Sequence, residues 1–422
     1  MSRDDWDWAV GRREIASLAA IRERYSRIDE WTVSPDGERL AAVVQDGDGF
    51  TALVNGESWG ESCELLWHLR YTPDGRLVAL VRDDDEWTVA VDGVPWEQRF
   101  EYAWNPILGA GPGRGGNAIA VSCKQAMQYG VAIDGRPWES GFLSLRDVCL
   151  SPDGTRAAAT VQVEAVKEAD VPAFFAGVWS VAVDGEAWER RFVNAWNPVF
   201  SPDGRSVAAE VRTSPRDYTI ALDGECWSSS FPCTWEPVFR PAGGAVIAPV
   251  RQDGAWHPVE NGRPLWQRRY NQLWRLRFSP DGGRLAAVVA IEFGRWTVAV
   301  DDLPWPAAFA DMVLPPVFSP DSRRVAAAVK DGGRWTIAVD GQTWPSTFDM
   351  VWDPIFTASG RHLLAKVEQD GAQRLAVDGR TGAARYERLW EPVSSPDGEH
   401  VLLRYVEDDR YHREVVRLDA LA

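Results

Sequence analysis

The sequence has few of the residues that hold metals and haem. Its 422 residues include 5 cysteines and 5 histidines, with no CxxC pair, no CxxCH haem attachment and no HxH or HExxH spacing. An odd number of cysteines does not indicate a disulfide framework. We therefore expect free thiols and no bound metal or other cofactor. The cysteines are Cys63, Cys123, Cys149, Cys226 and Cys233.

Basic charge and long apolar runs are also missing. Lys and Arg number 45 against 62 Asp and Glu, and the net charge of −17 repels nucleic-acid phosphates and anionic lipid surfaces. No run of about 18 apolar residues could span a membrane. The first eight residues, MSRDDWDW, are acidic where a signal peptide would be basic and then apolar. We expect a cytoplasmic protein with no membrane span and no nucleic-acid partner.

Tryptophan, by contrast, is abundant, with 23 residues, and a repeat explains it. The turn Ser-Pro-Asp-Gly at Ser34 recurs, with three degenerate copies, at spacings of 38, 37, 42, 50, 39, 39, 40, 38 and 38 residues. The turns begin at Ser34, Thr72, Gly109, Ser151, Ser201, Arg240, Ser279, Ser319, Thr357 and Ser395. A period near 39 is typical of a β-repeat array.

The unit that spans residues 196–227 shows what repeats. A strand leads into the Ser201 turn, a second and a third strand follow, and Asp223-Gly224 turns the chain into a short segment ending at Trp227. Asp-Gly between two alternating runs is a strong hairpin signal. The pattern predicts an all-β propeller of about ten four-stranded antiparallel blades over residues 25–422. Two five-bladed rings, or an open arc, are alternatives.

The two ends of the repeat are complementary. The last unit stops after its third strand, near Val415, whereas the first repeat strand begins at Tyr25. One end of the chain can therefore complete a sheet that the other end begins, which would close the ring and remove exposed edges.

The tryptophans occupy three positions of the unit. Seven stand five residues before the Ser-Pro-Asp-Gly-type turn: Trp67, Trp104, Trp196, Trp235, Trp274, Trp352 and Trp390. Five open the third strand: Trp87, Trp179, Trp256, Trp296 and Trp335. Eight close the Asp-Gly hairpin: Trp59, Trp96, Trp138, Trp188, Trp227, Trp266, Trp305 and Trp344. Because each position returns once per unit, we expect the rings to pack between neighbouring sheets.

Two segments fall outside the period. Residues 1–24 place Ile15, Leu18 and Ala19 at helical spacing, with Ser2 and Asp5 as a capping pair, and predict a short N-terminal helical extension. The long spacing in the fourth unit indicates an inserted loop near residues 164–177. Aromatic residues outside the repeat positions are candidate contacts for a partner. They are Trp6, Trp8, Phe174 and Phe175.

Some motifs only imitate catalytic or ligand-binding ones. The GxSxG of residues 56–60 lies in a hairpin rather than a strand-to-helix turn, and the GxGxxG of residues 111–116 precedes a strand rather than a helix. His362 and His400 stand where other units have arginine, and we interpret them as solvated. The acidic run of residues 83–86 lacks the spacing of calcium ligands and is interpreted as a solvated link. We expect no catalytic residues.

On these units, the sequence resembles the WD40-like, TolB-type propellers. The tryptophan in almost every hairpin, with the acidic balance, resembles more narrowly the tryptophan-repeat propeller family that forms part of the Tmc transmembrane electron-transfer complex of sulfate-reducing bacteria. This resemblance covers residues 25–422 as a pattern. It implies a cofactorless cytoplasmic protein beside an iron–sulfur subunit, a membrane cytochrome b and a multihaem cytochrome c. No functional residue can be transferred from it.

The leading hypothesis is thus a non-catalytic scaffold or docking subunit of a membrane-associated redox complex. Two alternatives remain open. Hairpins of the form Ala-Val-Asp-Gly-x-x-Trp partly resemble the tryptophan-docking motif of quinoprotein enzymes, although a secretion signal, adjacent cysteines and a calcium-ligand set are missing. The second alternative is a module that binds a peptide or a small ligand at the mouth of the ring.

Overall fold

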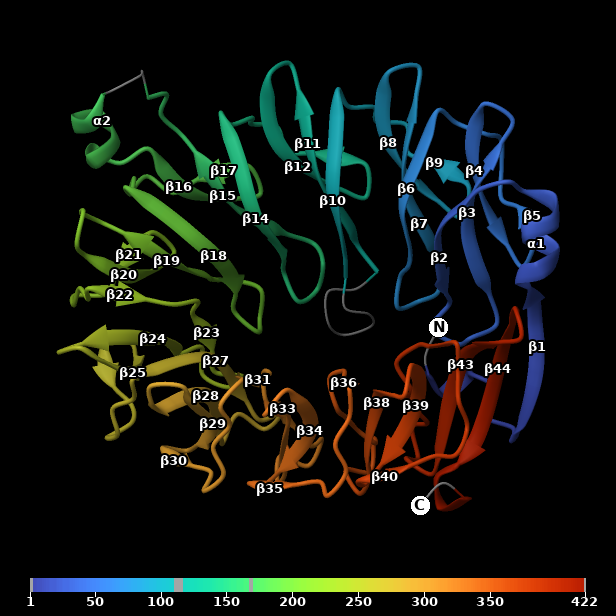
Figure 1. The fold of residues 1–422 in the computed structure, drawn as a ribbon. Coiled ribbons are helices and arrows are strands. Elements are labelled where there is room, and N and C mark those ends of the chain that lie inside the picture. Colours follow the sequence, from blue (N-terminus) through green and yellow to red (C-terminus); the bar gives the residue numbers. More distant parts are fainter. Residues whose placement is uncertain (1–2, 110–116, 167–169, 421–422) are drawn as a thin grey trace.

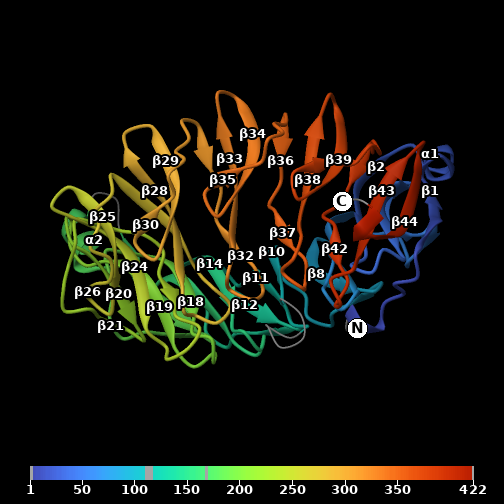
Figure 2. The same ribbon diagram turned by 90° about the horizontal axis from the view of Figure 1, so that it is seen from below.

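The structure is a computed structural model that describes residues 3–109, 117–166 and 170–420. Ten antiparallel sheets follow one another in chain order around a single ring (Figure 1). Seen at right angles to that view, the sheets stand side by side as separate blades (Figure 2). The prediction of a ten-bladed, four-stranded propeller is confirmed, and the chain forms one ring rather than two five-bladed rings or an open arc.

The first five blades each have four strands. Blade 1 consists of β2 (Ile28–Val33), β3 (Leu40–Asp46), β4 (Gly49–Val54) and β5 (Glu57–Ser58). Blade 2 consists of β6 (Leu65–Tyr71), β7 (Leu77–Asp83), β8 (Glu86–Val91) and β9 (Val94–Pro95). Blade 3 consists of β10 (Tyr102–Leu108), β11 (Ile119–Gln125), β12 (Gln128–Ile133) and β13 (Arg136–Pro137). Blade 4 consists of β14 (Ser144–Leu150), β15 (Ala157–Gln162), β16 (Trp179–Val183) and β17 (Glu186–Ala187). Blade 5 consists of β18 (Asn194–Phe200), β19 (Val207–Arg212), β20 (Tyr218–Leu222) and β21 (Glu225–Cys226).

In blades 6, 8, 9 and 10 the first strand is split into two short pieces. Blade 6 consists of β22 (Cys233–Thr234), β23 (Val238–Phe239), β24 (Val246–Gln252), β25 (Ala255–Glu260) and β26 (Arg263–Pro264). Blade 7 consists of β27 (Gln272–Phe278), β28 (Leu285–Glu292), β29 (Arg295–Val300) and β30 (Leu303–Pro304). Blade 8 consists of β31 (Met312–Val313), β32 (Val317–Phe318), β33 (Val325–Asp331), β34 (Arg334–Val339) and β35 (Gln342–Thr343). Blade 9 consists of β36 (Met350–Val351), β37 (Ile355–Phe356), β38 (Leu363–Gln369), β39 (Ala372–Val377) and β40 (Arg380–Thr381). Blade 10 consists of β41 (Arg388–Leu389), β42 (Val393–Ser394), β43 (His400–Glu407), β44 (Arg410–Arg417) and β1 (Gly11–Ser17).

Blade 10 joins the two ends of the chain, as the sequence predicted. Strand β1 pairs antiparallel with β44, with Gly11 opposite Val415 and Ser17 opposite Arg410, and supplies the strand that the last unit lacks. The guanidinium of Arg413, which is 1% exposed, donates through Nε to the carbonyl oxygen of Asp36 in blade 1 at 2.9 Å. The ring is therefore closed by backbone pairing inside blade 10 and by polar contacts to blade 1.

The predicted N-terminal helix exists but is shorter than expected. Helix α1 (Leu18–Arg24) begins where β1 ends, and the Ser17 side chain accepts a hydrogen bond from the Ala20 amide at its N-terminus. Ser17 is therefore the capping residue; Asp5 lies in the short 3-10 helix η1 (Arg3–Asp5), and Ser2 lies outside the described residues. Residues 11–17 form a strand because the open edge of β44 offers them a ladder, a tertiary effect that helical spacing does not reveal. A second 3-10 helix, η2, spans Leu418–Ala420.

The Asp-Gly turns do more than reverse the chain. Asp340 and Gly341 have φ of +49° and +83°, as in a type I′ turn, and Asp340 Oδ1 accepts a hydrogen bond from the amide of Val325, the first residue of β33, at 2.8 Å. Asn55 and Asn261 accept the equivalent bond in blades 1 and 6. Each such side chain fixes the start of the second strand to the end of the third.

We predict that Asp340→Ala lowers the free energy of unfolding by about 2 kcal/mol, because the buried amide of Val325 loses its acceptor and alanine disfavours positive φ. Asp340→Asn keeps both features and should change stability by less than about 0.5 kcal/mol. Urea unfolding of the two variants measures the difference. Equal losses in both would mean that the charge of Asp340, not its acceptor, stabilises the turn.

Most of the core lies between blades. Val78 and Leu80 of blade 2, for example, pack in one cluster with Ile119 and Val121 of blade 3. The tryptophans that close these hairpins extend the contacts, since seven of the eight lie against the glycine of the equivalent turn in the next blade; the exception is Trp266, because the next turn is Asp301-Asp302. A Cβ added to Gly341 would meet Trp305 at 3.3 Å. The expectation that the rings fill the seams between sheets is thus met at this position.

Candidate functional site

The strand connections give the ring two different faces. One, called here the turn face, carries the Ser-Pro-Asp-Gly-type turns and the Asp-Gly turns. The other, called the hairpin face, carries the hairpins between second and third strands and the links that lead from each blade to the first strand of the next. Side chains at these two sets of connections decide what each face can bind.

The turn face is occupied by contacts that hold the fold together. Arg284 Nε lies 3.1 Å from Asp301 Oδ2 of its own blade, and its Nη1 donates to the carbonyl oxygen of Arg323 in the next blade at 2.8 Å. Other guanidinium groups also reach a carbonyl of the following blade; they are those of Arg39, Arg76, Arg156 and Arg240. This face therefore presents polar groups that already have partners.

His362 occupies the arginine position of blade 9, as predicted, and its partly exposed side chain also has a partner within the blade. Its Nδ1 lies 2.6 Å from Oδ2 of Asp378, the aspartate of the Asp-Gly turn in the same blade, and the side chain is half-buried. The histidine thus replaces the arginine in the contact within the blade.

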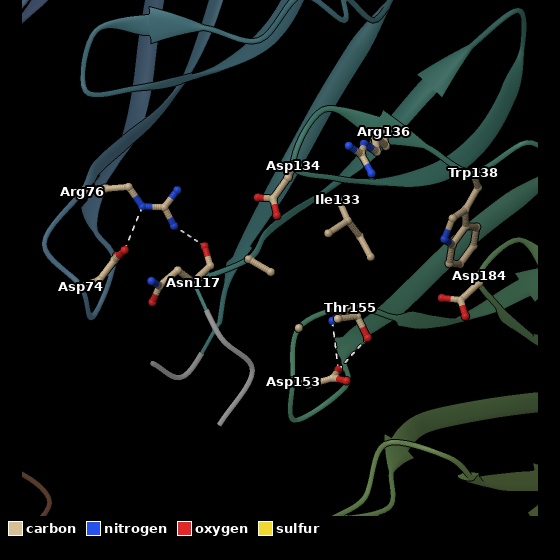
Figure 3. A pocket seen from close by; sticks show the side chains of 12 residues that line it. Asp74, Arg76, Asn117, Ile133, Asp134, Arg136, Trp138, Asp153, Thr155 and Asp184 are labelled. Carbon is tan, nitrogen blue, oxygen red and sulfur yellow. Dashed lines mark hydrogen bonds and ion pairs between the residues drawn. The ribbon is translucent and has the colours of Figure 1, made fainter. Parts of the chain in front are cut away.

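A groove of about 910 Å³ opens on the turn face over blades 2, 3 and 4 (Figure 3). It is lined by four carboxylates, Asp74, Asp134, Asp153 and Asp184, together with Arg76, Arg136 and Trp138. The carboxylates are used by the fold: Asp134 accepts from the Ile119 amide, Asp184 pairs with Arg156, and Asp74 pairs with Arg76.

Asp153 shows the electrostatic consequence of such a turn. Hydrogen bonds from the Ser151 hydroxyl, at 2.6 Å, and then from the amide and hydroxyl of Thr155 lower the pKa of Asp153 to about 2. A carboxylate held in this way stays ionised and is a poor proton donor or acceptor at neutral pH. Asp153 therefore serves this turn rather than acid–base chemistry.

The motifs that imitate catalytic sites have ordinary surroundings where they are described. Ser58 lies in β5, and its hydroxyl donates to the carbonyl oxygen of Gly60 at 2.8 Å. The GxGxxG of residues 111–116 lies outside the described residues. Within the described part of the chain, no three histidine, cysteine or acidic side chains gather so that they could hold a metal ion. None of its helices is long and apolar enough to cross a membrane.

The hairpin face differs from the turn face in its exposed apolar side chains. Fourteen large apolar side chains are exposed among the described residues, and eleven of them lie in the hairpins, in the links or in the first half of a first strand on this face. They are Trp67, Tyr102, Met127, Leu143, Val166, Val171, Phe175, Trp235, Ile291, Phe293 and Met312. They are spread over blades 2, 3, 4, 6, 7 and 8, and exposed apolar side chains that share one face are candidates for contact with a partner.

A row of five aromatic rings crosses blades 2 and 3 on this face. The ring centroids of Trp67 and Trp87 lie 5.0 Å apart, those of Trp87 and Tyr102 5.5 Å, those of Tyr102 and Trp104 5.5 Å, and those of Trp104 and Tyr129 5.9 Å. Trp87 is buried, whereas Trp67 is 37% and Tyr102 44% exposed. The row therefore offers two ring surfaces on a rigid base.

Sequence reasoning missed the two exposed rings of this row. Trp67 occupies the same repeat position as six other tryptophans, and only the packing around it shows that its ring is exposed. Tyr102 stands two residues before the repeat tryptophan Trp104 and is not one of the repeated aromatic positions. A search for aromatic residues that depart from the repeat would have found it.

Of the four residues predicted as partner contacts, Trp6 and Trp8 lie together against blade 10. Trp6 is only 9% exposed and packs on Leu402 and Val415, while Trp8 stacks on Trp6 with 5.9 Å between centroids. Although Trp6 stands outside every repeat position, it therefore has a structural place, since it packs on β43 and β44, the inner strands of the closing blade. The contact of these rings with a partner stays a prediction.

The other two predicted contacts lie on the hairpin face. Helix α2 (Val171–Ala176) forms part of the insert that was expected to be a loop, and Asp170 caps it by accepting from the Ala173 amide. Phe175 is 42% exposed and lies edge to face with Phe174, with 5.6 Å between centroids. The structure places this pair far along the ring from Trp6 and Trp8 (Figure 1), so the four rings do not form one site.

A buried carboxyl group lies between blades 5 and 6. Glu210 is 7% exposed, and burial, together with the nearby charge of Glu236, raises its pKa from 4.5 to about 7, while the Thr234 hydroxyl acts in the opposite direction. In the unfolded chain the same group ionises near its ordinary pKa. Between these values the folded state therefore binds more protons than the unfolded state, so stability must fall as the pH rises.

We predict that Glu210→Gln stabilises the protein relative to wild type by about 2 kcal/mol at pH 8 and hardly at all at pH 4.5, because glutamine removes the ionisation but keeps the shape. Urea unfolding of both proteins at a series of pH values measures the difference. A stability difference that does not change across this range would contradict the raised pKa.

Comparisons with known proteins identify no family. No protein-family model matches the chain, and no curated protein matches it. The solved structure of a eukaryotic initiation factor is 13% identical with a TM-score of 0.48, covering 78% of this chain and 89% of that one. TolB from Acinetobacter baumannii is 16% identical with a TM-score of 0.32, covering 71% and 77% of the two chains. The β-propeller domain of Cps50 (Swd1) from Myceliophteria thermophila is 10% identical with a TM-score of 0.29, covering 64% and 95%. We draw no conclusion about function from similarities at this level.

Proposed function

We propose that this protein is a non-catalytic docking module that binds a protein partner through its hairpin face. The observation that supports this proposal is the distribution of exposed apolar side chains, which gather on that face while the turn face uses its polar groups to join the blades. Phe293, at the tip of the β28–β29 hairpin, is 100% exposed, and Phe175 is 42% exposed. Side chains of this kind contribute nothing to the fold and much to an interface.

The partner that we propose is a redox complex at a membrane, as the sequence resemblance implies. In this proposal the chain binds an iron–sulfur subunit at the cytoplasmic side and stands beside a membrane cytochrome b and a multihaem cytochrome c. Electron transfer belongs to those proteins, and the propeller supplies only a binding surface. The resemblance, not the fold, is the support for this particular assembly.

Purification of the tagged protein from native membranes tests both parts. We expect it to be recovered with proteins that carry haem absorbance and iron, and we expect Phe175→Asp combined with Phe293→Asp to release them. The control is Val94→Asp combined with Leu303→Asp, because these side chains are 69% and 64% exposed at the turn face. Recovery of a free monomer would contradict the docking role, and partners without haem or iron would contradict the redox assembly alone.

A further inference from the structure

The aromatic row of blades 2 and 3, defined above by Trp67, Trp87, Tyr102, Trp104 and Tyr129, has an acidic rim. Exposed carboxylates adjoin it in the hairpin between β7 and β8 and directly before β6 and β10, and the cations that stand among them are Arg82, Arg99 and Lys124. The carboxylates are those of Glu64, Asp83, Asp84, Asp85, Glu86 and Glu101. Arg82 pairs with Asp85 and Glu64, and the six carboxylates still outnumber the cations of the rim.

Other blades show what lies on a tryptophan in the position of Trp67. The Lys366 ammonium lies 4.0 Å from the ring centroid of Trp352, and the Arg388 guanidinium lies 4.9 Å from that of Trp390. Arg146 lies 5.9 Å from the centroid of Trp196 and 4.3 Å from that of Trp179. In three blades the chain thus covers this indole with a cation of its own.

Blade 2 keeps the ring and lacks the cation, as do blades 3, 6 and 7, where no described arginine or lysine side chain lies over Trp104, Trp235 or Trp274. None of the described arginine or lysine side chains lies over Trp67, whose ring is 37% exposed, whereas Trp196, Trp352 and Trp390 are only partly exposed under their cations. The surroundings of Trp67 are anionic, so an approaching cation would gain both the ring surface and the carboxylates. A ring surface and a charge of this kind fit a guanidinium from another molecule.

Building on the proposed docking role, we infer that the row binds an arginine-containing segment of a protein partner. One guanidinium lies over Trp67 and hydrogen-bonds to the carboxylates of the β7–β8 hairpin, and a second lies over Tyr102 beside Glu101. Arginine fits better than lysine because its planar group stacks on a ring while its N–H groups still reach carboxylates. Nucleic acid and anionic lipid are repelled by the same rim.

Fluorescence anisotropy with a labelled peptide of alternating arginine and glycine tests this inference. We expect Trp67→Leu to weaken binding by about tenfold, since leucine keeps the contact with Trp87 but offers no π surface. Trp235→Leu is the matched control: Trp235 is 38% exposed and stacks on Trp256 with 5.4 Å between centroids, but its hairpin carries Arg251. This control should bind within about twofold of wild type.

A variant that changes only charge tests the inference without changing the packing around Trp67. Asp84→Asn combined with Asp85→Asn should also weaken binding by about tenfold, because asparagine keeps the positive φ of both residues and removes two charges. The control is Asp408→Asn combined with Asp409→Asn, a hairpin with the same pair of positive φ values in blade 10. The lysine–glycine peptide should bind more weakly than the arginine–glycine peptide.

The outcomes separate this inference from the proposed function. If wild type does not bind the arginine peptide, or if both tryptophan variants and both charge variants bind equally well, the row is not the site and any binding reflects net charge alone. The Trp67→Leu protein could fail to bind the peptide and still be recovered with the partner from membranes. That result would contradict an arginine segment of the partner at this row and leave the docking role intact. If no partner is recovered with wild type, the peptide measurement still decides the chemistry of the row.

Discussion

Removal of residues 1–16 is expected to lower the free energy of unfolding by about 5 kcal/mol, because Trp6 alone buries on the order of 200 Å² of apolar surface against blade 10. The truncation leaves Ser17 in place to cap α1 but takes away the strand that pairs with β44. Thermal and urea unfolding measure the loss. We also expect association of truncated chains in gel filtration, since an unpaired strand edge pairs readily with another.

Two further proteins separate the causes of that loss. Deletion of residues 1–9 removes Trp6 and Trp8 but keeps β1, and it should cost less than the longer deletion. A peptide of residues 3–16 added to the truncated protein should restore part of the stability by pairing with β44. If the truncated protein unfolds at the same denaturant concentration as the full chain, strand β1 does not close the ring.

Gly93→Ala is expected to destabilise the protein by about 3 kcal/mol, because a Cβ at this position would lie 2.3 Å from the carbonyl oxygen of Trp59 in the neighbouring blade. The glycine also has a φ of +83°, which alanine adopts only at a cost. Backbone on both sides of the seam between blades 1 and 2 would have to move apart. Urea unfolding measures the effect.

Gly254→Ala is the matched control for the backbone part of that effect. Its φ is +84°, but a Cβ there would meet nothing within 4 Å, so we expect a loss of about 1 kcal/mol from conformation alone. The excess at Gly93 then measures the packing of the seam. Equal losses in the two variants would mean that the tryptophan of one blade and the glycine of the next do not determine the spacing between blades.

These results bear on binding because a docking face works best on a rigid support. The exposed rings of the hairpin face lie on blades whose relative positions are fixed by seam tryptophans, by arginines that reach the next blade and by the closing strand. A partner that binds several blades at once therefore loses little free energy in ordering the surface. A variant that loosens a seam should weaken partner binding even when it changes no exposed residue.

Local sequence signals were enough to predict the blades and their order along the chain. Asp-Gly and Ser-Pro-Asp-Gly turns dictate where the chain reverses, since their φ values and hydrogen bonds are properties of a few neighbouring residues. The spacing of the turns therefore predicted ten sheets, and the unfinished last unit predicted closure by the N-terminus. The length of α1 was overestimated because residues 11–17 follow the edge of β44, which is 390 or more residues away in the chain.

The candidate site was less accessible to such reasoning. Trp67 and Trp352 occupy the same position of the repeat, and nothing in the local sequence says that one is covered by Lys366 and the other exposed. Likewise, Trp6 stood outside every repeat position, and only the structure shows that it packs on Leu402 and Val415 of blade 10. Exposure depends on which side chains the folded sheets place over a ring, and over Trp352 that side chain is Lys366 of the same blade.

The amino-acid sequence by itself therefore determined the repeat, the strand order within a blade and the acidic character of the chain, because turn chemistry and composition act over a few residues or over the whole chain at once. Only the tertiary structure decided that there is one ring, that its apolar side chains gather on the hairpin face, and which aromatic rings remain uncovered. The physical reason is that the exposure of each ring depends on the side chains that the folded sheets bring over it, from its own blade or from the next, and the repeated turns do not determine those side chains.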